Sequence, residues 1–334
     1  MKTFIKGISY YLPEKELTNE QLVSEFPDWT VDKIADKVGI KKRHIAAEDE
    51  TALDMAIAAS EKLFEEYNIE KTSIDFILLC TQSPDYFLPT SACIVQDRLK
   101  LPTCCGTLDF NMGCSGFVYG LSLAKGLICA EISKNVLLIT SETYSKHLHP
   151  KDKGNRTIFG DAACATLISA EGFAEIGDFI LGTDGKGANN LIVKSGAFRQ
   201  PVKSAQIVYD DAENPVSDDY LYMNGAEIFS FTLESVPQLV ADTLMKNSMR
   251  KEDIDMFVFH QANKYMMDFL RKKIKIEPAK FYYCLENMGN TVSSTIPIAL
   301  KEAMNDCSIK QGDKVLIAGF GVGYSWGGTV LTFD

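Results

Sequence analysis

Residues 73–83 read SIDFILLCTQS, and residues 253–263 read DIDMFVFHQAN. Each stretch holds a short, almost continuous apolar run that ends in small polar residues. Runs of this kind are typical of parallel strands that are buried on both faces of a sheet. The sequence therefore predicts two equivalent buried strands in an α/β protein, at residues 74–80 and 254–260.

The segments that surround these two runs match as well. A helix with apolar residues at helical spacing is expected at residues 52–67, before the first strand, and another near residues 236–245, before the second. Farther along, the apolar run at 135–140 has a counterpart at 314–319. The chain thus repeats one βα pattern twice.

A repeat of this kind predicts two pseudo-equivalent halves packed into one body. We expect the halves to be residues 1–172 and residues 173–334, because the apolar segment at 159–168 closes the first pattern. Residues 189–219 lack a clear periodicity and are expected to form a long surface excursion.

Composition and charge limit the classes of function. The chain has 34 Lys and Arg against 45 Asp and Glu, for a formal net charge of −11. General attraction to nucleic acid or to an anionic membrane is not expected at this charge. No apolar run approaches the roughly 18 residues that span a bilayer, and residues 1–8 lack the apolar core of a signal peptide. We therefore expect a cytoplasmic protein without a nucleic-acid or membrane partner.

The nine cysteines are an odd number and include no C-x-x-C pair, so neither a disulfide framework nor a metal site is expected. Cys114 differs from the others because it lies in residues 106–121, GTLDFNMGCSGFVYGL, where a short strand ends and an apolar helix begins. Gly113 and Gly116 permit a tight backbone and the close approach of another molecule. A thiol at a helix N-terminus is expected to favour the thiolate, which attacks thioesters. A small residue packed at a crowded corner is the alternative.

His260 and Asn290 are two further candidates for the site. His260 ends the second buried strand, and the carboxyl ends of strands are where α/β sheets bind ligands. Asn290 lies in residues 287–294, NMGNTVSS, a glycine- and amide-rich turn that enters a helix. A core histidine and an ordinary turn would explain the two positions equally well when each is considered alone.

The glycine-rich segment at residues 319–328, GFGVGYSWGG, superficially looks like a dinucleotide-binding loop. No helix is expected after it and the chain ends in a strand, so nicotinamide binding is rejected. A flexible turn would instead let a backbone N–H point into a site as half of an oxyanion hole.

Taken together, these motifs resemble in order and spacing those of the ketoacyl-ACP synthase III family of the thiolase superfamily. The resemblance covers essentially the whole chain and implies the thiolase fold, a duplicated five-layer αβαβα body that forms a homodimer. The matching stretches are GCSGF at 113–117, HQAN at 260–263, GNT at 289–291, GVGYSWG at 321–327, GIKKRHIA at 39–46 and FGDA at 159–162.

The resemblance also implies a reaction. An acyl-CoA primer would condense with malonyl-ACP, with loss of CO2, to give 3-oxoacyl-ACP and so initiate the synthesis of fatty acids or related acyl chains. Cys114 would carry the acyl group, while His260 and Asn290 would bind the malonyl thioester and promote its decarboxylation. Backbone N–H groups of Cys114 and Val322 would form the oxyanion hole. Acyl-CoA and malonyl-ACP are substrates here, and the resemblance implies neither a cofactor nor a metal.

Contacts to the substrates follow from the same resemblance. CoA contacts are implied at Trp29, Lys33 and Lys153, and Lys33 or Lys37 would replace an arginine that relatives use to hold CoA. Leu88 matches a position that shapes the acyl pocket across the dimer interface.

Docking of the acyl carrier protein is implied on the helix that follows His260. Tyr265 stands where relatives commonly have an arginine for this purpose, so the basic patch would consist of Lys264, Arg271, Lys272 and Lys273. A solvated helix face explains these charges nearly as well.

Three other classes of protein share part of this pattern. A thiolase-fold acyltransferase would pass the acyl group from CoA to an oxygen or nitrogen nucleophile in a secondary pathway, but the presence of both His260 and Asn290 favours condensation. A papain-like hydrolase uses the same residue types, with its cysteine near the mature N-terminus. A non-catalytic partner subunit usually lacks the nucleophile, whereas Cys114 is present.

Overall fold

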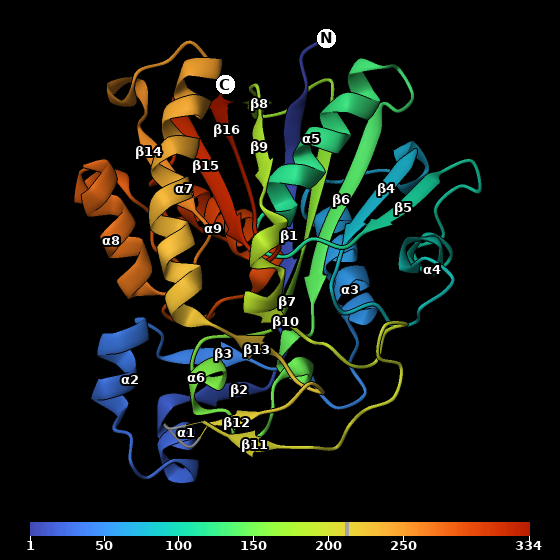
Figure 1. Ribbon diagram of the computed structural model, residues 1–334. Coiled ribbons are helices and arrows are strands. Elements are labelled where there is room, and N and C mark those ends of the chain that lie inside the picture. The colour runs from blue at the N-terminus through green and yellow to red at the C-terminus, as the bar shows by residue number, and fades with distance from the viewer. Residues whose placement is uncertain (211–213) are drawn as a thin grey trace.

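Strands from both halves of the chain build one ten-stranded sheet in the computed structural model, which describes residues 1–210 and 214–334 (Figure 1). The first half supplies β1 (Phe4–Tyr11), β4 (Phe76–Cys80), β5 (Gly106–Phe110), β6 (Asn135–Glu142) and β7 (Ala162–Ser169). The second half supplies β8 (Ala174–Ile176), β9 (Ile180–Thr183), β14 (Met256–Phe259), β15 (Lys314–Gly321) and β16 (Ser325–Phe333). Their order is β14-β15-β16-β8-β1-β7-β6-β4-β5, with β9 also paired to β16.

The strands of the two halves are connected in the same way. In the first half, β1 pairs antiparallel with β7, β7 antiparallel with β6, and β6, β4 and β5 run parallel. In the second half, β8 and β9 pair antiparallel with β16, β16 antiparallel with β15, and β15 parallel with β14. A parallel bridge between Phe257 and Phe281 takes the place of the β4–β5 pair. This correspondence supports the proposal that residues 1–172 and 173–334 are two duplicated units.

Helices fill three layers around the two parts of the sheet. Helices α5 (Gly116–Cys129) and α9 (Thr295–Asn305) lie at the centre, where their apolar side chains share one buried cluster with strands of both halves. Helices α3 (Ala52–Glu66) and α4 (Ser91–Arg98) cover the outer face of the first half. Helices α7 (Gly225–Lys246) and α8 (Lys264–Ile274) cover that of the second (Figure 1). The expected αβαβα layering is confirmed.

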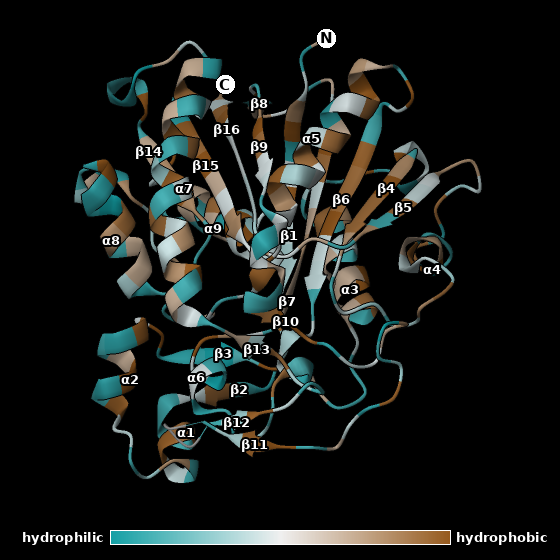
Figure 2. Cartoon of the chain, in the orientation of Figure 1, coloured by the Kyte–Doolittle hydropathy of each residue, from teal (hydrophilic) through white to brown (hydrophobic). Residues whose placement is uncertain are grey.

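The sequence explains why the central elements are buried. All but the first residue of β6 are buried, and so are four of the five residues of β4. Figure 2 shows both strands coloured as hydrophobic along most of their length. Strands with apolar residues on both faces are fully buried only when helices cover both faces of the sheet, which is the arrangement observed.

Two helices show how well their limits follow from the sequence. Helix α3 begins where expected, because Thr51 and Asp54 form a capping box in which each side chain accepts the other's backbone N–H, at 3.2 and 3.0 Å. Helix α7 begins much earlier than expected, at Gly225, after the N-cap Asn224. The helix starts with Gly225 and contains Pro237 near its middle, both of low helix propensity, and burial of apolar side chains on one face outweighs that cost.

Shorter elements gather at the end of the sheet where β6 terminates (Figure 1). They include helices α1 (Asn19–Glu25), α2 (Val31–Val38) and α6 (Lys153–Arg156), and strands β2 (Glu16–Thr18), β3 (Lys42–His44), β10 (Leu191–Ile192), β11 (Val208–Tyr209), β12 (Pro215–Val216) and β13 (Tyr222–Met223). The single-turn 3-10 helices are η1 (Lys71–Ser73), η2 (Tyr144–His147), η4 (Lys251–Asp253), η5 (Pro278–Lys280) and η6 (Val292–Ser294), with the longer η3 at Gly185–Asn190. The expected excursion at 189–219 therefore contains short strands. Within the described part of the chain, no helix has the length and apolarity to cross a membrane.

The tight contact between α5 and β6 predicts a large effect of a cavity there. Leu138 in β6 is fully buried, and a Cβ atom added to Gly120 of α5 would lie 2.4 Å from its Cδ1 atom. We expect Leu138→Ala to lower the free energy of unfolding by about 2–5 kcal/mol. Leu123→Ala, in the same helix at 42% exposure, should cost less than about 1 kcal/mol. Urea titration followed by tryptophan fluorescence measures both, and equal losses would contradict the packing described.

Candidate active site

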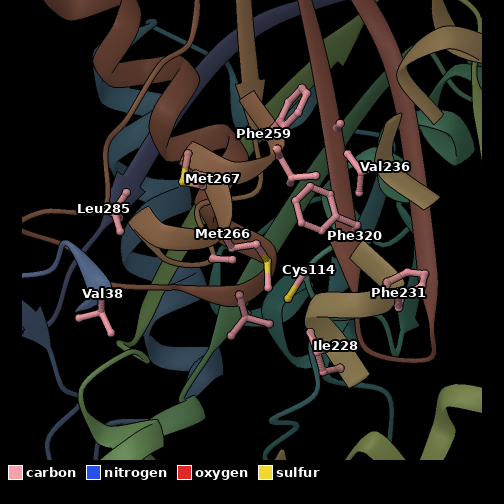
Figure 3. Close-up of a cluster of buried hydrophobic side chains, with 14 of the residues drawn as sticks. Val38, Cys114, Ile228, Phe231, Val236, Phe259, Met266, Met267, Leu285 and Phe320 are labelled. Atoms are coloured by element: carbon pink, nitrogen blue, oxygen red, sulfur yellow. The ribbon is translucent and has the colours of Figure 1, made fainter. Parts of the chain in front are cut away.

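Cys114 lies at the corner between β5 and α5 and is 6% exposed. The turn between β15 and β16 approaches it from the second half of the chain. A Cβ atom added to Gly321 would lie 2.9 Å from the Cys114 Sγ atom, and one added to Gly113 would lie 2.5 Å from a methyl carbon of Val322. The absence of side chains at these two glycines lets the turn reach the thiol. Figure 3 shows the sulfur among buried apolar side chains, with Phe320 above it.

The backbone N–H groups of Cys114 and Val322 both face the Cys114 sulfur, where they favour its charged form. Burial acts more strongly in the other direction, and together with the nearby charge of Glu142 it raises the pKa of the Cys114 thiol to about 12. The N–H groups at this helix start therefore act in the expected direction, but burial outweighs them and leaves the resting residue a thiol. A helix dipole contributes about 0.3–1 kcal/mol, whereas full burial moves a pKa by up to about 3–5 units.

His260 follows β14 and is 2% exposed. Its ring stands edge-on to Phe320, the residue before Gly321, with 5.7 Å between ring centroids. Burial lowers the pKa of His260 to about 3, so the ring is neutral at physiological pH. Its Nδ1 atom lies 2.7 Å from the Thr295 hydroxyl, which donates to the Val292 carbonyl at 3.1 Å and has one proton to give. The hydroxyl can therefore donate to Nδ1 only when it turns away from that carbonyl. When that hydroxyl donates to Nδ1, the ring proton resides on Nε2.

The orientation of the Asn290 amide follows from its hydrogen bonds. Its Oδ1 atom accepts the backbone N–H of Val292 at 2.9 Å, so its NH2 group points the other way. The Nδ2 atom lies 3.4 Å from His260 Nε2 and 3.4 Å from the carbonyl oxygen of Ala262. Two N–H donors, one from the imidazole and one from the amide, can therefore converge on one substrate oxygen.

Glu142, Thr295 and Tyr144 were not predicted as site residues. Glu142 ends β6, is fully buried, and has its pKa raised by burial to about 8. Burial and the neighbouring Cys114 and Glu142 raise the pKa of Tyr144 well above its usual value, and its hydroxyl donates to Gln82 at 3.2 Å. A sequence signal existed for Glu142, because polar residues follow the apolar run at 135–140, as they do at His260.

The candidate CoA residues lie beside a cleft of about 280 Å³. The cleft lining includes Trp29, Lys37, Val38, Asn155, Leu221 and Met223. The Nζ atoms of Lys33 and Lys37 are each 5.5 Å from the centroid of the Trp29 ring, and of these two lysines Lys37 lines the cleft. Lys153 pairs with Asp28 at 3.6 Å, next to Trp29 in the chain. Val38 and Leu221 of the cleft lining also belong to the large apolar cluster that contains Cys114.

Leu88 is 79% exposed, in the segment between β4 and α4. Its neighbours Tyr86 and Phe87 are also exposed, and the Phe87 ring lies 6.0 Å from that of Phe198, which is 90% exposed. The structure thus places Leu88 in an apolar surface patch, defined here as residues 86–88 with Phe198 and Val202.

The basic residues expected to dock a carrier protein all lie on α8, but some of them already have partners within the protein. Lys264 pairs with Asp268 at 3.0 Å, and Arg271 donates to the carbonyl of Ile276 at 3.2 Å. Lys272 and Lys273 are exposed near the end of the helix. On the same helix, Tyr265 is 61% exposed and stacks on Phe229 of α7 with 5.6 Å between centroids.

Comparison with known proteins gives consistent matches over the whole chain. The family model of 3-oxoacyl-[acyl-carrier-protein (ACP)] synthase III matches residues 108–185, and the model of its C-terminal part matches residues 244–333. A beta-ketoacyl-[acyl-carrier-protein] synthase III of Clostridium perfringens is 36% identical over 326 residues, with 97% of each chain covered. A beta-ketoacyl-[acyl-carrier-protein] synthase III 1 of Vibrio parahaemolyticus is 35% identical over 336 residues, with 100% of each covered.

Solved structures give the same result. A crystal structure of a 3-oxoacyl-(acyl-carrier-protein) synthase III has 49% identity and a TM-score of 0.97, with 100% of both chains covered. The 3-oxoacyl-(acyl-carrier protein) synthase of Burkholderia xenovorans LB400 has 35% identity and a TM-score of 0.91, with 100% of this chain and 94% of that chain covered.

The raised pKa of Cys114 predicts how the thiol responds to pH. Below its pKa the thiol is protonated, so the thiolate fraction and the rate of alkylation should rise about tenfold per pH unit, without a plateau up to about pH 10. Iodoacetamide labelling of the intact protein, followed by peptide mass spectrometry, measures this rate. The exposed Cys104, Cys129 and Cys307 serve as references in the same sample. A plateau for Cys114 below about pH 8 would show a stabilised thiolate instead.

Proposed function

The chain belongs to the 3-oxoacyl-[acyl-carrier-protein] synthase III family of condensing acyltransferases, and from this premise we propose that Cys114, His260 and Asn290 form its active site. The enzyme initiates fatty acid synthesis by a condensation. The observation that carries the assignment of residues is the buried corner where the Cys114 thiol, two backbone N–H groups and the donors of His260 and Asn290 meet.

The first half-reaction loads the acyl primer from acyl-CoA onto Cys114. The sulfur attacks the thioester carbonyl, a new C–S bond forms, and the bond to the CoA sulfur breaks. The proton that the Cys114 thiol loses is balanced by the one that the departing CoA thiolate gains. The N–H groups of Cys114 and Val322, which face the sulfur, are placed to donate to the oxyanion. Each such donor typically contributes about 3–4 kcal/mol to the transition state.

The second half-reaction forms the carbon–carbon bond. The thioester carbonyl of malonyl-ACP accepts hydrogen bonds from His260 Nε2 and Asn290 Nδ2. Loss of CO2 leaves an enolate that these two donors stabilise, and its carbon attacks the acyl group on Cys114. The bond between the acyl carbon and the Cys114 sulfur then breaks, which releases 3-oxoacyl-ACP and a Cys114 thiolate that takes up a proton from solvent. A neutral His260 suits this role because the ring need only donate. The Thr295 hydroxyl holds the required tautomer when it donates to Nδ1 in place of the Val292 carbonyl. The reaction as proposed uses two substrates and no cofactor.

Acyl-CoA is proposed to bind along the cleft that Trp29 lines. The indole offers a face on which an adenine can stack, and the ammonium groups of Lys33 and Lys37 lie close enough to pair with phosphates. Lys153, which is paired with Asp28 beside Trp29, is placed to contribute a third positive charge.

The carrier protein is proposed to dock on α8, whose N-terminus follows the site residues at 260–263. Because the chain has a net charge of −11, an acidic partner needs a local concentration of positive charge, and the helix supplies it. The docking residues are Lys264, Arg271, Lys272 and Lys273, of which Lys272 and Lys273 are the most exposed.

A homodimer is also proposed, with its interface on the side of β5. This strand ends the sheet, and its Leu108 is 46% exposed. The apolar surface patch around Leu88 follows the neighbouring strand β4, and apolar patches next to an open sheet edge commonly mark interfaces. In such a dimer Leu88 would reach the acyl pocket of the partner.

Separate assays of the two half-reactions test the residue roles. Incubation with acyl-CoAs should add one acyl mass to the natural chain and none to Cys114→Ala. His260→Ala and Asn290→Ala should still be acylated, but should release CO2 from malonyl-ACP about 100- to 1,000-fold more slowly. Intact mass and radiolabelled CO2 measure the two steps. Acyl transfer without any CO2 release by the natural chain would favour the acyltransferase that transfers to oxygen or nitrogen.

Substitution of Trp29 tests the CoA cleft. The Trp29 ring is proposed to contact only the nucleotide. Trp29→Ala should therefore raise KM for acetyl-CoA about tenfold, which corresponds to the binding free energy of one lost aromatic contact. The same variant should leave KM unchanged for acetyl-N-acetylcysteamine, a thioester without the nucleotide. An equal rise of KM for both thioesters would show that the substitution disturbs the surroundings of the Cys114 thiol and not nucleotide binding in the cleft.

A further inference from the structure

Glu142 joins the two halves of the molecule next to the proposed site. It ends β6 in the first half and is fully buried. Its Oε1 atom accepts the hydroxyl of Ser293 at 3.2 Å, from η6 in the second half. Its Oε2 atom accepts the hydroxyl of Ser83 at 3.1 Å, and both oxygens accept the backbone N–H of Gln82, at 3.1 and 3.0 Å. The carboxyl group is therefore a bridge with partners on both sides.

The partner in the second half belongs to the loop that carries Asn290. Val292, between Asn290 and Ser293, has φ of +55°, in the left-handed region that β-branched residues rarely adopt. The Asn290 Oδ1 atom holds the N–H of this residue at 2.9 Å. A strained residue persists only when its surroundings hold it in place. The hydrogen bond from Ser293 to Glu142 supplies such support immediately after the strained position.

A second set of hydrogen bonds, which does not involve Glu142, also attaches the loop to β6. The Ser294 hydroxyl lies 2.8 Å from the Thr140 hydroxyl and donates to the Thr140 carbonyl at 3.1 Å. Loss of the bond between Glu142 and Ser293 should therefore loosen the Asn290 side of the loop and leave the rest of η6 docked on β6.

The charge of Glu142 acts on the nucleophile as well. Glu142 lies close enough to Cys114 for its charge to raise the pKa of the thiol, after the larger effect of burial. The other titratable groups that face it are Asp161, Cys80 and Tyr144. Above its pKa of about 8, the negative charge of Glu142 opposes the thiolate of Cys114, while the hydrogen bonds of the same group support Asn290.

We propose that Glu142 is a positioning residue for the condensation step, which through Ser293 fixes the Asn290 amide. The proposal rests on the proposed function, since it assigns Asn290 to decarboxylation and Cys114 to acylation. Loss of this support must therefore slow decarboxylation without slowing the acylation of Cys114.

The test compares Glu142→Gln, Ser293→Ala and the double variant in both half-reactions. Ser293→Ala, which removes the donor, should slow CO2 release from malonyl-ACP about tenfold. Glu142→Gln should slow it less, because the amide oxygen can still accept the Ser293 hydroxyl. In the double variant the losses should not add, because the two residues act through one hydrogen bond. Glu142→Gln should in addition speed alkylation of Cys114 by iodoacetamide at about pH 9, whereas Ser293→Ala should leave it unchanged, because only the former removes the charge.

Ser60→Ala is the matched control, because Ser60 is a fully buried serine in α3 that donates to the Ala56 carbonyl at 2.7 Å. Both rates should be unchanged in that variant. A parallel fall of acylation and CO2 release in Glu142→Gln, or unchanged CO2 release in Ser293→Ala, would overturn the positioning role. Failure of the natural chain to form an acyl-enzyme would instead overturn the proposed function, so the two failures are distinguishable.

Discussion

Water is excluded from the point where the two halves of the molecule meet, and the behaviour of each titratable group there follows from that exclusion. The charged form of a buried group loses its hydration, so the pKa values of Cys114 and Glu142 rise while that of His260 falls. The resting site therefore holds a thiol and a neutral imidazole. Donors without a net charge, the backbone N–H groups and the Asn290 amide, are the ones that such a site can use at little cost.

The exclusion of water depends on how closely the β15–β16 turn approaches Cys114. Added Cβ atoms would lie 2.9 Å from the Cys114 carbonyl oxygen at Gly319 and 2.9 Å from its sulfur at Gly321. Side chains at these positions would push the halves apart, admit water and move the Val322 N–H away from the sulfur. Glycine is thus required here for contact between the halves, and the electrostatics of the site rest on that contact.

The duplicated topology explains why the chemistry comes from both halves. Cys114 precedes α5 in the first half, and Asn290 precedes α9 at the corresponding place in the second. These two helices pack together at the centre of the molecule, which brings their entry turns close to each other. The matching strands β4 and β14 end in Cys80 and immediately before His260, so equivalent positions carry different side chains. One repeated scaffold therefore holds the proposed nucleophile on one side and the proposed hydrogen-bond donors on the other.

The sequence by itself determined the duplicated α/β architecture, because a strand buried on both faces needs a nearly continuous apolar run whatever packs against it. It also singled out Cys114, His260 and Asn290, which stand at strand ends and helix entries. It marked Glu142 only as a polar residue at a strand end, and it could not reveal what Glu142 or Thr295 contacts, since their partners lie 151 and 35 residues away in the chain. Nor could it give the direction of the Cys114 pKa shift. The helix N-terminus is visible in the sequence, whereas the stronger effect, burial, exists only once the two halves have packed together.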